Sequence, residues 1–392
     1  MMSTQVRLKK GKSSLLALRS PWIFSGALEK LPPNLEQGQW VDVLDEYGRI
    51  VATGHFHPSS IAVRVLQFHE MDDLKGFYQE KLCQAYHLRQ RLGCIHNQST
   101  SAYRLVHGEG DGLSGLIIDV YSQVAIIQCH TLGMWRDIPH ILEGLLGLPG
   151  TPVISVYTKS ASVLPHADVQ DGFLFEPKVD ALEVIESGIK YKVDFIQGQK
   201  TGLFLDQRNN RALLSNYCRN KKVLNTFCYT GGFSLAALQG GADEVVSVDQ
   251  SSWAIDHAIK NVEANFGTSC GHTAVISKVV PYLQNLTSKF DIIIVDPPAY
   301  AKNLDHRHGA IKAYSRLNFE AIKQLNPGGL LFTFSCSQVV GRELFEGAVL
   351  SAAMEAKRDA RILHYLEQSP DHPVNIFHRE GLYLKGLVLE FD

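Results

Sequence analysis

The stretch VLNTFCYTGGFS at residues 223–234 decides how the C-terminal half of the chain is expected to fold. It opens as an apolar strand, turns through Gly231 and Gly232, and continues into the helical run LAAL at 235–238. Glycine lets the backbone approach a ligand closely, and the first turn of a helix has free N–H groups. Asp249 follows at the end of the next expected strand. The stretch therefore predicts a ligand site at the carboxyl ends of parallel strands.

The rest of this half alternates short apolar strands with helices. We expect strands at 222–227, 244–248, 292–295 and 330–334, and helices near 233–239, 251–265 and 309–325. Such alternation is typical of a parallel sheet covered on both faces. Two further strand-like runs, at 362–366 and 382–391, favour an antiparallel hairpin at one sheet edge, unlike an ordinary dinucleotide-binding fold. The predicted fold class is α/β, with a Rossmann-like C-terminal domain.

The N-terminal half predicts two smaller domains. Strands at 40–44 and 61–66, with glycine and proline between them, indicate a β-rich module. A charged helix at 73–95 follows, and then a mixed α+β region with strands at 115–121, 124–128 and 153–157 and a helix at 138–146. The expected domain boundaries are 1–72, 73–188 and 189–392.

Composition limits the class of protein and its compartment. The 392 residues are 45% hydrophobic and 20% charged, which is ordinary for a globular protein. No apolar run approaches the roughly 18 residues of a membrane helix, and the N-terminus lacks the apolar stretch of a signal peptide. Seven cysteines without CxxC pairs fit a reducing cytoplasm. The histidines, including His55 and His57, form no recognisable metal set and are interpreted as surface residues. We expect a cytoplasmic protein that binds neither membrane nor metal.

The charge distribution leaves nucleic-acid binding open. A net charge of −2 lacks the overall basic balance of many RNA-binding proteins. Residues 1–20 nevertheless carry basic side chains and no acidic ones, at Arg7, Lys9, Lys10, Lys12 and Arg19. Such a run is either a solvated surface or a local contact for phosphate groups.

An adenosine cofactor is the expected ligand of the 223–234 stretch. A carboxylate at Asp249 can accept hydrogen bonds from both hydroxyls of a ribose, which would serve NAD equally well. The GxGxxG spacing that serves a pyrophosphate is absent, and this favours S-adenosylmethionine. The polar segment 199–211 either covers the cofactor or forms a surface turn. The residues expected to bind the cofactor are Thr201, Gln207, Arg208, Phe227, Tyr229, Thr230, Gly231, Asp249, Gln250, Asp296 and Pro297.

A stiff acidic turn follows the apolar strand at 292–295. It reads Asp296-Pro297-Pro298-Ala299-Tyr300, and its two prolines fix the backbone. An acid held there could orient an amine or a ring nitrogen of the substrate, and Tyr300 and Lys302 are the expected substrate contacts beside it. The alternative is a proline-rich turn whose aspartate caps the next helix.

The next strand ends in Ser335-Cys336-Ser337, and Cys336 is the expected nucleophile. A thiolate can add to carbon 6 of cytosine and make carbon 5 nucleophilic enough to accept a methyl group. The alternative is an inert buried cysteine. Cys228 is the competing thiol, and its place after the first strand favours packing or cofactor lining.

These stretches together resemble the bacterial large-subunit ribosomal RNA methyltransferase I family, which makes 5-methylcytosine in 23S ribosomal RNA. The resemblance covers nearly the whole chain and rests on six stretches in the family's order, at 21–26, 108–116, 200–211, 227–234, 296–298 and 335–337. It implies an N-terminal PUA-like RNA-binding domain, a small central α+β domain and a class I methyltransferase domain, often assembled as a homodimer. It also implies that Cys336 is the nucleophile, Asp296 the substrate-positioning acid and Asp249 the ribose acid. Lys9, Lys10 and Lys12 then become expected RNA contacts.

One position departs from the family pattern. The family usually has an aspartate near the adenine, at the end of a strand that lies between those at 244–248 and 292–295, and this chain has Lys278 at the corresponding position. Three alternatives stay beside cytosine carbon-5 methylation. The first is a methyltransferase that acts on a base nitrogen without a cysteine nucleophile. The second is a non-catalytic RNA-binding assembly factor with a degenerate cofactor pocket. The third, an NAD-dependent oxidoreductase, is disfavoured because no phosphate loop is visible.

Overall fold

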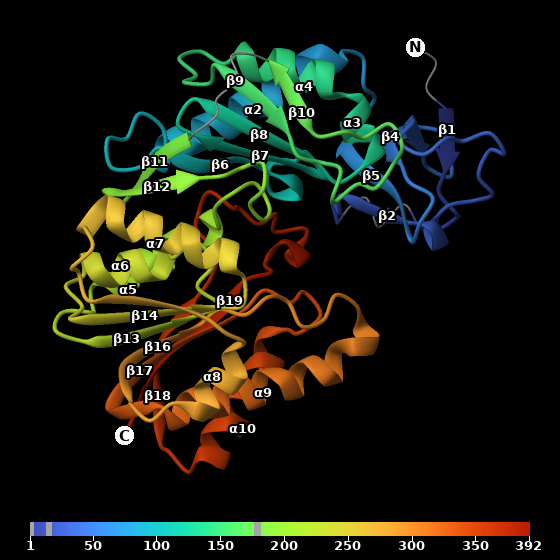
Figure 1. Cartoon of the computed structure of the whole chain (residues 1–392). Helices are drawn as coiled ribbons and strands as arrows, with labels where there is room; N and C mark the ends of the chain where they lie inside the picture. The colour runs from blue at the N-terminus through green and yellow to red at the C-terminus, as the bar shows by residue number, and fades with distance from the viewer. Residues whose placement is uncertain (1–3, 13–17, 176–181) are drawn as a thin grey trace. The chain divides into compact units, whose positions relative to one another are not determined.

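The computed structural model describes residues 4–12, 18–175 and 182–392, so parts of the expected first and central domains lie outside the described residues. The chain forms two units, each built from separate segments (Figure 1). The first unit contains Met1–Val184, Val193–Gly202 and Pro370–Gly381, and the second contains Ile185–Lys192, Leu203–Ser369 and Leu382–Asp392. The sequence led us to expect three domains that follow one another along the chain, whereas each of the two units combines segments from different parts of it. The expected boundaries at 72 and 188 stay a prediction.

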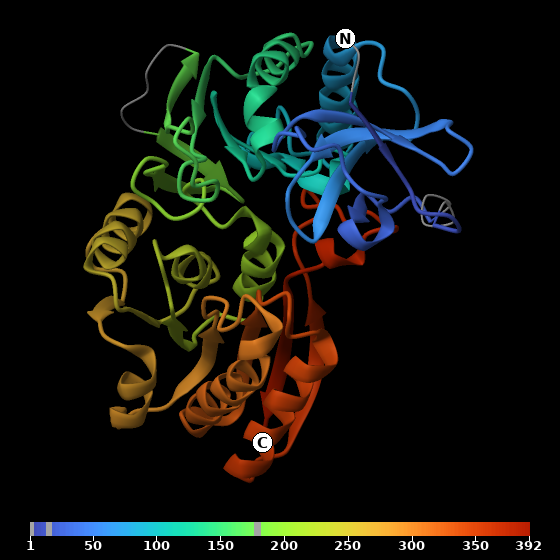
Figure 2. The same ribbon diagram turned by 90° about the vertical axis from the view of Figure 1, so that its right-hand side faces the viewer.

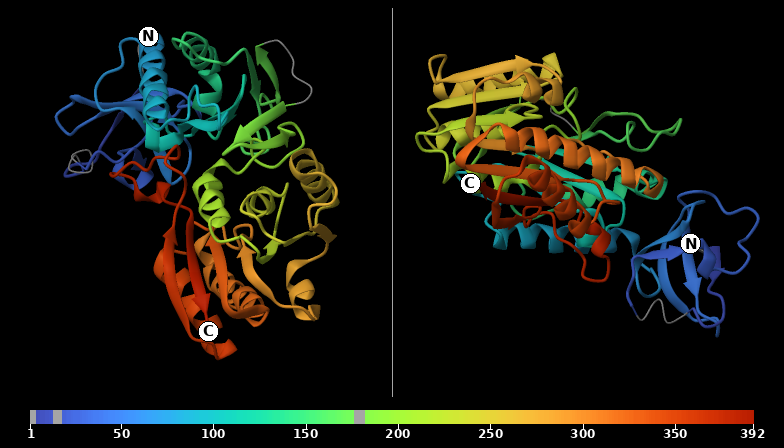
Figure 3. Two further views of the ribbon diagram at one scale, coloured as in Figure 1. Left: turned by 90° about the vertical axis from the view of Figure 1, so that its left-hand side faces the viewer. Right: turned by 90° about the horizontal axis from the view of Figure 1, so that it is seen from below.

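A five-stranded sheet opens the first unit and is coloured blue in Figure 3. Its strands, in spatial order, are β1 (Thr4–Arg7), β3 (Trp40–Leu44), β4 (Ile50–Phe56), β5 (Ile61–Gln67) and β2 (Trp22–Phe24). The pairing of β1 with β3 is parallel, and the other pairings are antiparallel. Val6, Val41 and Val63 lie in its apolar core. The β-rich module predicted from the sequence is confirmed.

One histidine of this sheet corrects a prediction. His55 of β4, interpreted above as a surface residue, is 2% exposed. Its Nε2 lies 2.9 Å from Oδ2 of Asp137, which also accepts a hydrogen bond from the Tyr78 hydroxyl at 2.7 Å. The two partners of the histidine contact are 82 positions apart, so no local pattern could show that His55 is buried.

The second sheet of this unit belongs to the central part of the chain. Its strands, in spatial order, are β10 (Gly172–Phe175), β9 (Ser155–Thr158), β8 (Val124–Cys129), β7 (Leu116–Tyr121) and β6 (Ala102–His107). Its helices are α2 (Leu74–Arg91), α3 (Leu132–Arg136) and α4 (Ile138–Leu146). Leu82, Ile118 and Ile141 are fully buried in the core that these helices share with the sheet. A separate two-stranded ribbon pairs β11 (Leu182–Glu186) with β12 (Ile189–Val193).

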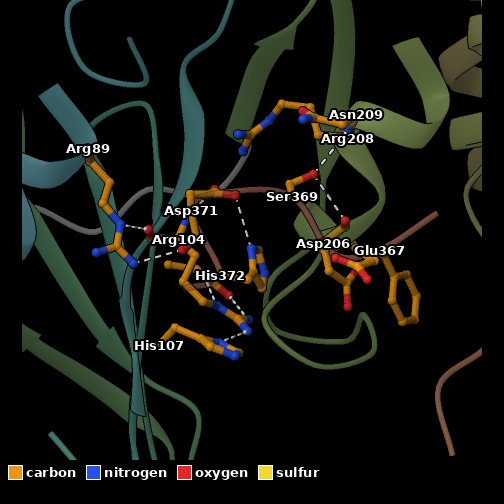
Figure 4. Close-up of polar contacts among 12 residues, drawn as sticks. Arg89, Arg104, His107, Asp206, Arg208, Asn209, Glu367, Ser369, Asp371 and His372 are labelled. Carbon is orange, nitrogen blue, oxygen red and sulfur yellow. Dashed lines mark hydrogen bonds and ion pairs between the residues drawn. The ribbon is translucent and has the colours of Figure 1, made fainter. Parts of the chain in front are cut away.

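Buried charges hold the segment Pro370–Gly381 within the first unit. Arg89 of α2 is fully buried, pairs with Asp111 at 2.5 Å and donates to the backbone carbonyl of Asp371 at 2.7 Å. The Asp371 carboxylate accepts from the backbone N–H of Arg104 at 2.9 Å and lies 3.0 Å from Nδ1 of His372 (Figure 4). These contacts order a connection that leaves and re-enters the second unit.

Replacing Arg89 by methionine is expected to lower the free energy of unfolding by about 3–5 kcal/mol, because it leaves buried carboxylate and carbonyl groups without their cation. Urea denaturation measures this loss. Arg91→Met on the same helix is the matched control, because Arg91 is exposed and its loss should cost no more than about 0.5 kcal/mol. Equal stability of the two variants would contradict a structural role for the buried pair.

The second unit is built on a seven-stranded sheet (Figure 2). Its strands, in spatial order, are β15 (His272–Ile276), β14 (Glu244–Asp249), β13 (Lys222–Thr226), β16 (Phe290–Val295), β17 (Leu325–Ser335), β19 (Lys385–Phe391) and β18 (Ala360–Leu366). The first five strands are parallel, and β19 is antiparallel to both of its neighbours. The α/β fold and the antiparallel pair at one edge are therefore confirmed.

Helices cover both faces of this sheet. Figure 1 shows α5 (Arg208–Ser215), α6 (Gly232–Gln239) and α7 (Ser252–Phe266) on one face. The other face carries α8 (Val279–Asn285), α9 (Arg307–Lys323) and α10 (Arg342–Ala356). Neither α8 nor α10 was predicted from the sequence. Leu283, Leu317 and Phe345 bury these helices in one apolar core with the sheet.

Candidate active site

The candidate site lies at the carboxyl ends of four neighbouring parallel strands of the second unit. Asp249 is the last residue of β14, and the turn at 227–231 follows β13. Asp296 directly follows β16, and Cys336 directly follows β17. Because parallel strands end at the same edge, the sheet brings these four predicted features to one side.

The turn after β13 has an unusual backbone. Phe227, Tyr229 and Gly231 have φ of 55°, 48° and 86°, in the left-handed region. Non-glycine residues rarely adopt this conformation, and it is found where surrounding contacts impose it. The backbone N–H of Tyr229 donates to Oδ2 of Asp249 at 3.1 Å, and that of Cys228 donates to the carbonyl of Val248 at 3.1 Å. The end of β14 thus holds the turn in place.

Gly231 meets two requirements of this turn. Its positive φ disfavours any side chain, and an added Cβ would lie 3.1 Å from the Cβ of Ala258 in α7. The glycine therefore lets the start of α6 approach α7 closely and keeps the backbone of the turn free to face a ligand.

The Asp249 carboxylate is half-buried and has acceptor capacity to spare. Its Oδ1 accepts from the backbone N–H of Ser251 at 3.0 Å, and its Oδ2 accepts from Tyr229. A carboxylate can accept about four hydrogen bonds, so two ribose hydroxyls can still bind here. The turn and the acid together fit an adenosine cofactor.

Aromatic side chains that the sequence analysis did not select line this turn. The Tyr229 ring lies 5.2 Å from the Phe204 ring and 5.8 Å from the Trp253 ring, measured between centroids. The Trp253 ring in turn stacks on His257 at 4.0 Å. Trp253 lies four residues after Asp249. This short spacing from the expected ribose acid is the sequence feature from which Trp253 could have been predicted as a residue of the site.

Thr230 and Gln250, which were also predicted to bind the cofactor, differ in exposure. Thr230 is buried, and its carbonyl accepts from Asn261 at 3.1 Å, whereas Gln250 is exposed. Lys278 is exposed at the start of α8, so the position after β15 carries a cation.

Two residues of the 199–211 segment have buried acidic partners. Arg208 is 9% exposed, and its Nε lies 3.6 Å from the carboxylate of Glu186, which also binds Arg211. Thr201 belongs to the first unit, where its hydroxyl donates to Asp119 at 2.6 Å. These contacts fix both side chains in the folded chain, and their contact with the cofactor stays a prediction.

Gln207 connects the same segment to the acidic turn. It is 2% exposed, and its Nε2 donates to Oδ2 of Asp296 at 3.0 Å. Asn210 donates to Oε1 of Gln207 at 2.6 Å, which fixes the orientation of the amide. The Asp296 carboxylate is therefore oriented by a buried amide, and Asn210 is a supporting residue that the sequence analysis missed.

The structure brings the acidic turn and the predicted nucleophile together. Cys336 is half-buried, and its Sγ lies 4.0 Å from the carbonyl oxygen of Pro297. Ser337 donates to the carbonyl of Ala301 at 2.7 Å, which ties the two turns side by side. The thiol is thus neither sealed in the interior nor at another edge of the sheet.

The competing thiol has a different environment. Cys228 is 5% exposed, and burial raises the pKa of its thiol well above the ordinary value. A thiol of this kind stays protonated at neutral pH, so it is a poor nucleophile. The contrast favours Cys336 as the reactive cysteine.

The predicted substrate contacts differ in exposure. Tyr300 is half-buried against Tyr314, with ring centroids 4.9 Å apart, and burial raises the pKa of Tyr300 to about 12. It lines a surface hollow of about 380 Å³ beside α9, and Lys302 is exposed on the same loop. In the first unit Lys9 donates to the carbonyl of Gly26 at 2.9 Å, and Lys10 and Lys12 are exposed.

Lys385 is a further residue of this site that the sequence analysis missed. It is 6% exposed, and its Nζ donates to the carbonyls of Ser337 at 2.6 Å and Val340 at 2.8 Å. A lysine inside the otherwise apolar run LYLKGLVL at 382–389 is the signal that could have found it.

The described residues contain neither a candidate metal site nor a candidate membrane span. Within residues 4–12, 18–175 and 182–392, no group of three or more histidine, cysteine or acidic side chains could hold a metal ion. No helix in this part of the chain combines the length and the apolar character that crossing a membrane requires.

Comparison with known proteins defines the class. A family model described as S-adenosylmethionine-dependent methyltransferase matches residues 152–383, and a model of a PUA-like domain matches residues 6–68. The chain is thus an S-adenosylmethionine-dependent methyltransferase that carries a PUA-like domain.

Individual relatives narrow the class to a family. The Tolumonas auensis protein named ribosomal RNA large subunit methyltransferase I is 38% identical, over 99% of each chain. The Escherichia coli K12 protein of that name is 36% identical, over 98% of each chain. The chain belongs to the ribosomal RNA large subunit methyltransferase I family. A solved structure from Streptococcus mutans, described as a SAM-dependent methyltransferase, has the same fold, with a TM-score of 0.84, 22% identity and coverage of 99% of this chain and 100% of that one.

Proposed function

We propose that this protein transfers a methyl group from S-adenosylmethionine to carbon 5 of a cytosine in the 23S RNA of the large ribosomal subunit. The contact between Cys336 Sγ and the Pro297 carbonyl, at 4.0 Å, carries the proposal, because it sets a half-buried thiol beside an oriented acid. The RNA class follows from the name of the relatives, which are 38% and 36% identical over nearly the whole chain.

Cys336 and Asp296 have distinct roles in the proposed reaction. The Cys336 thiolate adds to carbon 6 of the cytosine, and the electron pair of the 5,6 double bond moves to carbon 5. S-adenosylmethionine, when bound, supplies the methyl group that carbon 5 accepts. Loss of the carbon-5 proton then returns the electron pair to the ring and expels the thiolate. Asp296, oriented by Gln207, accepts a hydrogen bond from the exocyclic amine and holds the base in register.

The cofactor is proposed to lie across the ends of β13 and β14. The turn at 227–231 would face it with backbone groups, and Asp249 would accept from its ribose hydroxyls. Gln250 follows Asp249 directly, and Pro297 follows Asp296 at the end of the neighbouring strand β16, so both are proposed to line the same site. No acid follows β15, so the adenine would be held by groups other than the usual carboxylate.

The proposed RNA contacts comprise Tyr300 and Lys302 beside the site and Lys9, Lys10 and Lys12 in the PUA-like domain. An exposed lysine attracts phosphate without requiring an overall basic protein. Assembly as a homodimer and a cytoplasmic location stay predictions.

Mapping of 5-methylcytidine in 23S RNA by mass spectrometry tests the proposal in cells that lack the protein. We expect one 5-methylcytidine to disappear and to return when the wild-type gene is restored, but not when a Cys336→Ala variant is expressed. Loss of a nitrogen-methylated base instead would favour the alternative methyltransferase, and an unchanged RNA would reject the assignment.

A further inference from the structure

The pairing of the strands places Lys385 beside the end of β17, the strand that Cys336 directly follows. Lys385 is the first residue of β19, which runs antiparallel to β17. In this register it pairs with Ser335, the residue directly before Cys336. The sheet therefore brings a residue from the end of the chain to the turn of the predicted nucleophile.

The ammonium group of Lys385 forms hydrogen bonds with the backbone of that turn. It donates to the carbonyl of Ser337, one residue after Cys336, and to that of Val340, where the turn leads towards α10. The side chain is 6% exposed. Burial of an ammonium group is unfavourable unless its hydrogen bonds are made, so the lysine and the turn fix each other.

Other charged and titratable groups face the same turn. Burial lowers the pKa of Lys385 to about 8, Arg342 at the start of α10 lowers it too, and a negative charge on Cys336 raises it. Tyr314 of α9 stays neutral, because burial raises its pKa to about 12, with further contributions from Cys336 and Asp296. Lys385 is mostly protonated at neutral pH, so it places a positive charge beside the turn that follows Cys336.

We propose that Lys385 is a positioning residue for Cys336, whose ammonium group holds the turn at 337–340 and favours the thiolate over the thiol. This role rests on the proposed function, in which Cys336 is the nucleophile. An opposite charge nearby stabilises a thiolate, and the thiol proton passes to solvent. Lys385 itself forms no bond to the substrate.

The pH dependence of alkylation by iodoacetamide tests this role without methyl transfer. Peptide mass spectrometry follows Cys336 in the full-length protein, and Cys83 and Cys270, which are partly exposed, serve as internal references. In the wild-type protein we expect Cys336 to reach half of its maximal rate at a lower pH than Cys270. Lys385→Met should slow alkylation of Cys336 about tenfold at pH 7 and move its profile to higher pH, leaving both references unchanged.

Two further variants separate charge from structure. Lys385→Gln retains a hydrogen-bond donor without the charge, and it should resemble Lys385→Met if charge matters. Lys385→Arg should restore most of the wild-type profile. An unchanged profile in Lys385→Gln would overturn the proposal. If the variants fold poorly, the wild-type protein alone still tests the proposal. The proposal would be overturned if alkylation of wild-type Cys336 reached half of its maximal rate at a pH no lower than that for Cys270.

The activity of Cys336→Ala distinguishes failure of this inference from failure of the proposed function. If that variant still methylates RNA, the nucleophile assignment falls, whatever the alkylation profiles show. If it is inactive while the Lys385 variants leave alkylation unchanged, only the role of Lys385 is wrong.

Discussion

Cys336→Ala is expected to lower kcat for methyl transfer by at least about a thousandfold, because carbon 5 of cytosine is a weak nucleophile until a thiolate adds to carbon 6. Transfer of a labelled methyl group to unmodified 23S RNA under single-turnover conditions measures the loss. Binding of S-adenosylhomocysteine should be retained, since the thiol belongs to the substrate side of the proposed site.

The matched control is Cys270→Ala, which removes another partly exposed thiol of the same unit and should leave kcat unchanged. Full methyl transfer by Cys336→Ala would end the covalent proposal and favour methylation of a base nitrogen. The half-buried position of the sulfur beside Pro297 makes the opposite outcome the expected one.

Asp249→Ala is expected to weaken binding of S-adenosylhomocysteine about a hundredfold. The change removes the acceptor for the ribose hydroxyls, and each hydrogen bond to a charged group contributes about 1.5–3 kcal/mol. It also frees the Tyr229 N–H that helps to hold the turn. Isothermal titration calorimetry on the purified protein measures the dissociation constant.

Asp256→Ala is the control for this experiment, because Asp256 is an exposed acid of the neighbouring helix α7 and should leave the affinity as it is. An unchanged affinity in Asp249→Ala would reject the ribose assignment. Absence of S-adenosylhomocysteine binding by the wild-type protein at millimolar concentration would favour the non-catalytic RNA-binding alternative. Lys278, which stands where the family has an acid near the adenine, would then explain the loss of affinity.

Local patterns in the sequence were enough to find the strands that form the site. β13, β14 and β16 are short and apolar, and each is followed by a polar or glycine-rich turn. The weaker elements were missed. β15 is mostly half-exposed, so it lacks the apolar run that marks the central strands. The helix α10, which lies between β17 and β18, was also not predicted.

The roles of individual side chains were harder to predict. Arg208 and Thr201 lie in a stretch that resembles the family, yet Glu186 and Asp119 are their partners. Gln207, from the same stretch, reaches Asp296, 89 positions away. A linear pattern shows that a segment is polar, but it does not show which of its side chains points to which partner.

Local sequence patterns were sufficient to predict the α/β class and the edge of the sheet at which the motifs meet, because neighbouring parallel strands have their carboxyl ends at one edge. The folded chain was needed to show that Lys385 lies beside the Cys336 turn and that His55 and Arg89 are buried with their carboxylate partners. Local periodicity is set by neighbours in the chain, whereas these contacts depend on which strands and helices pair across long separations in the sequence.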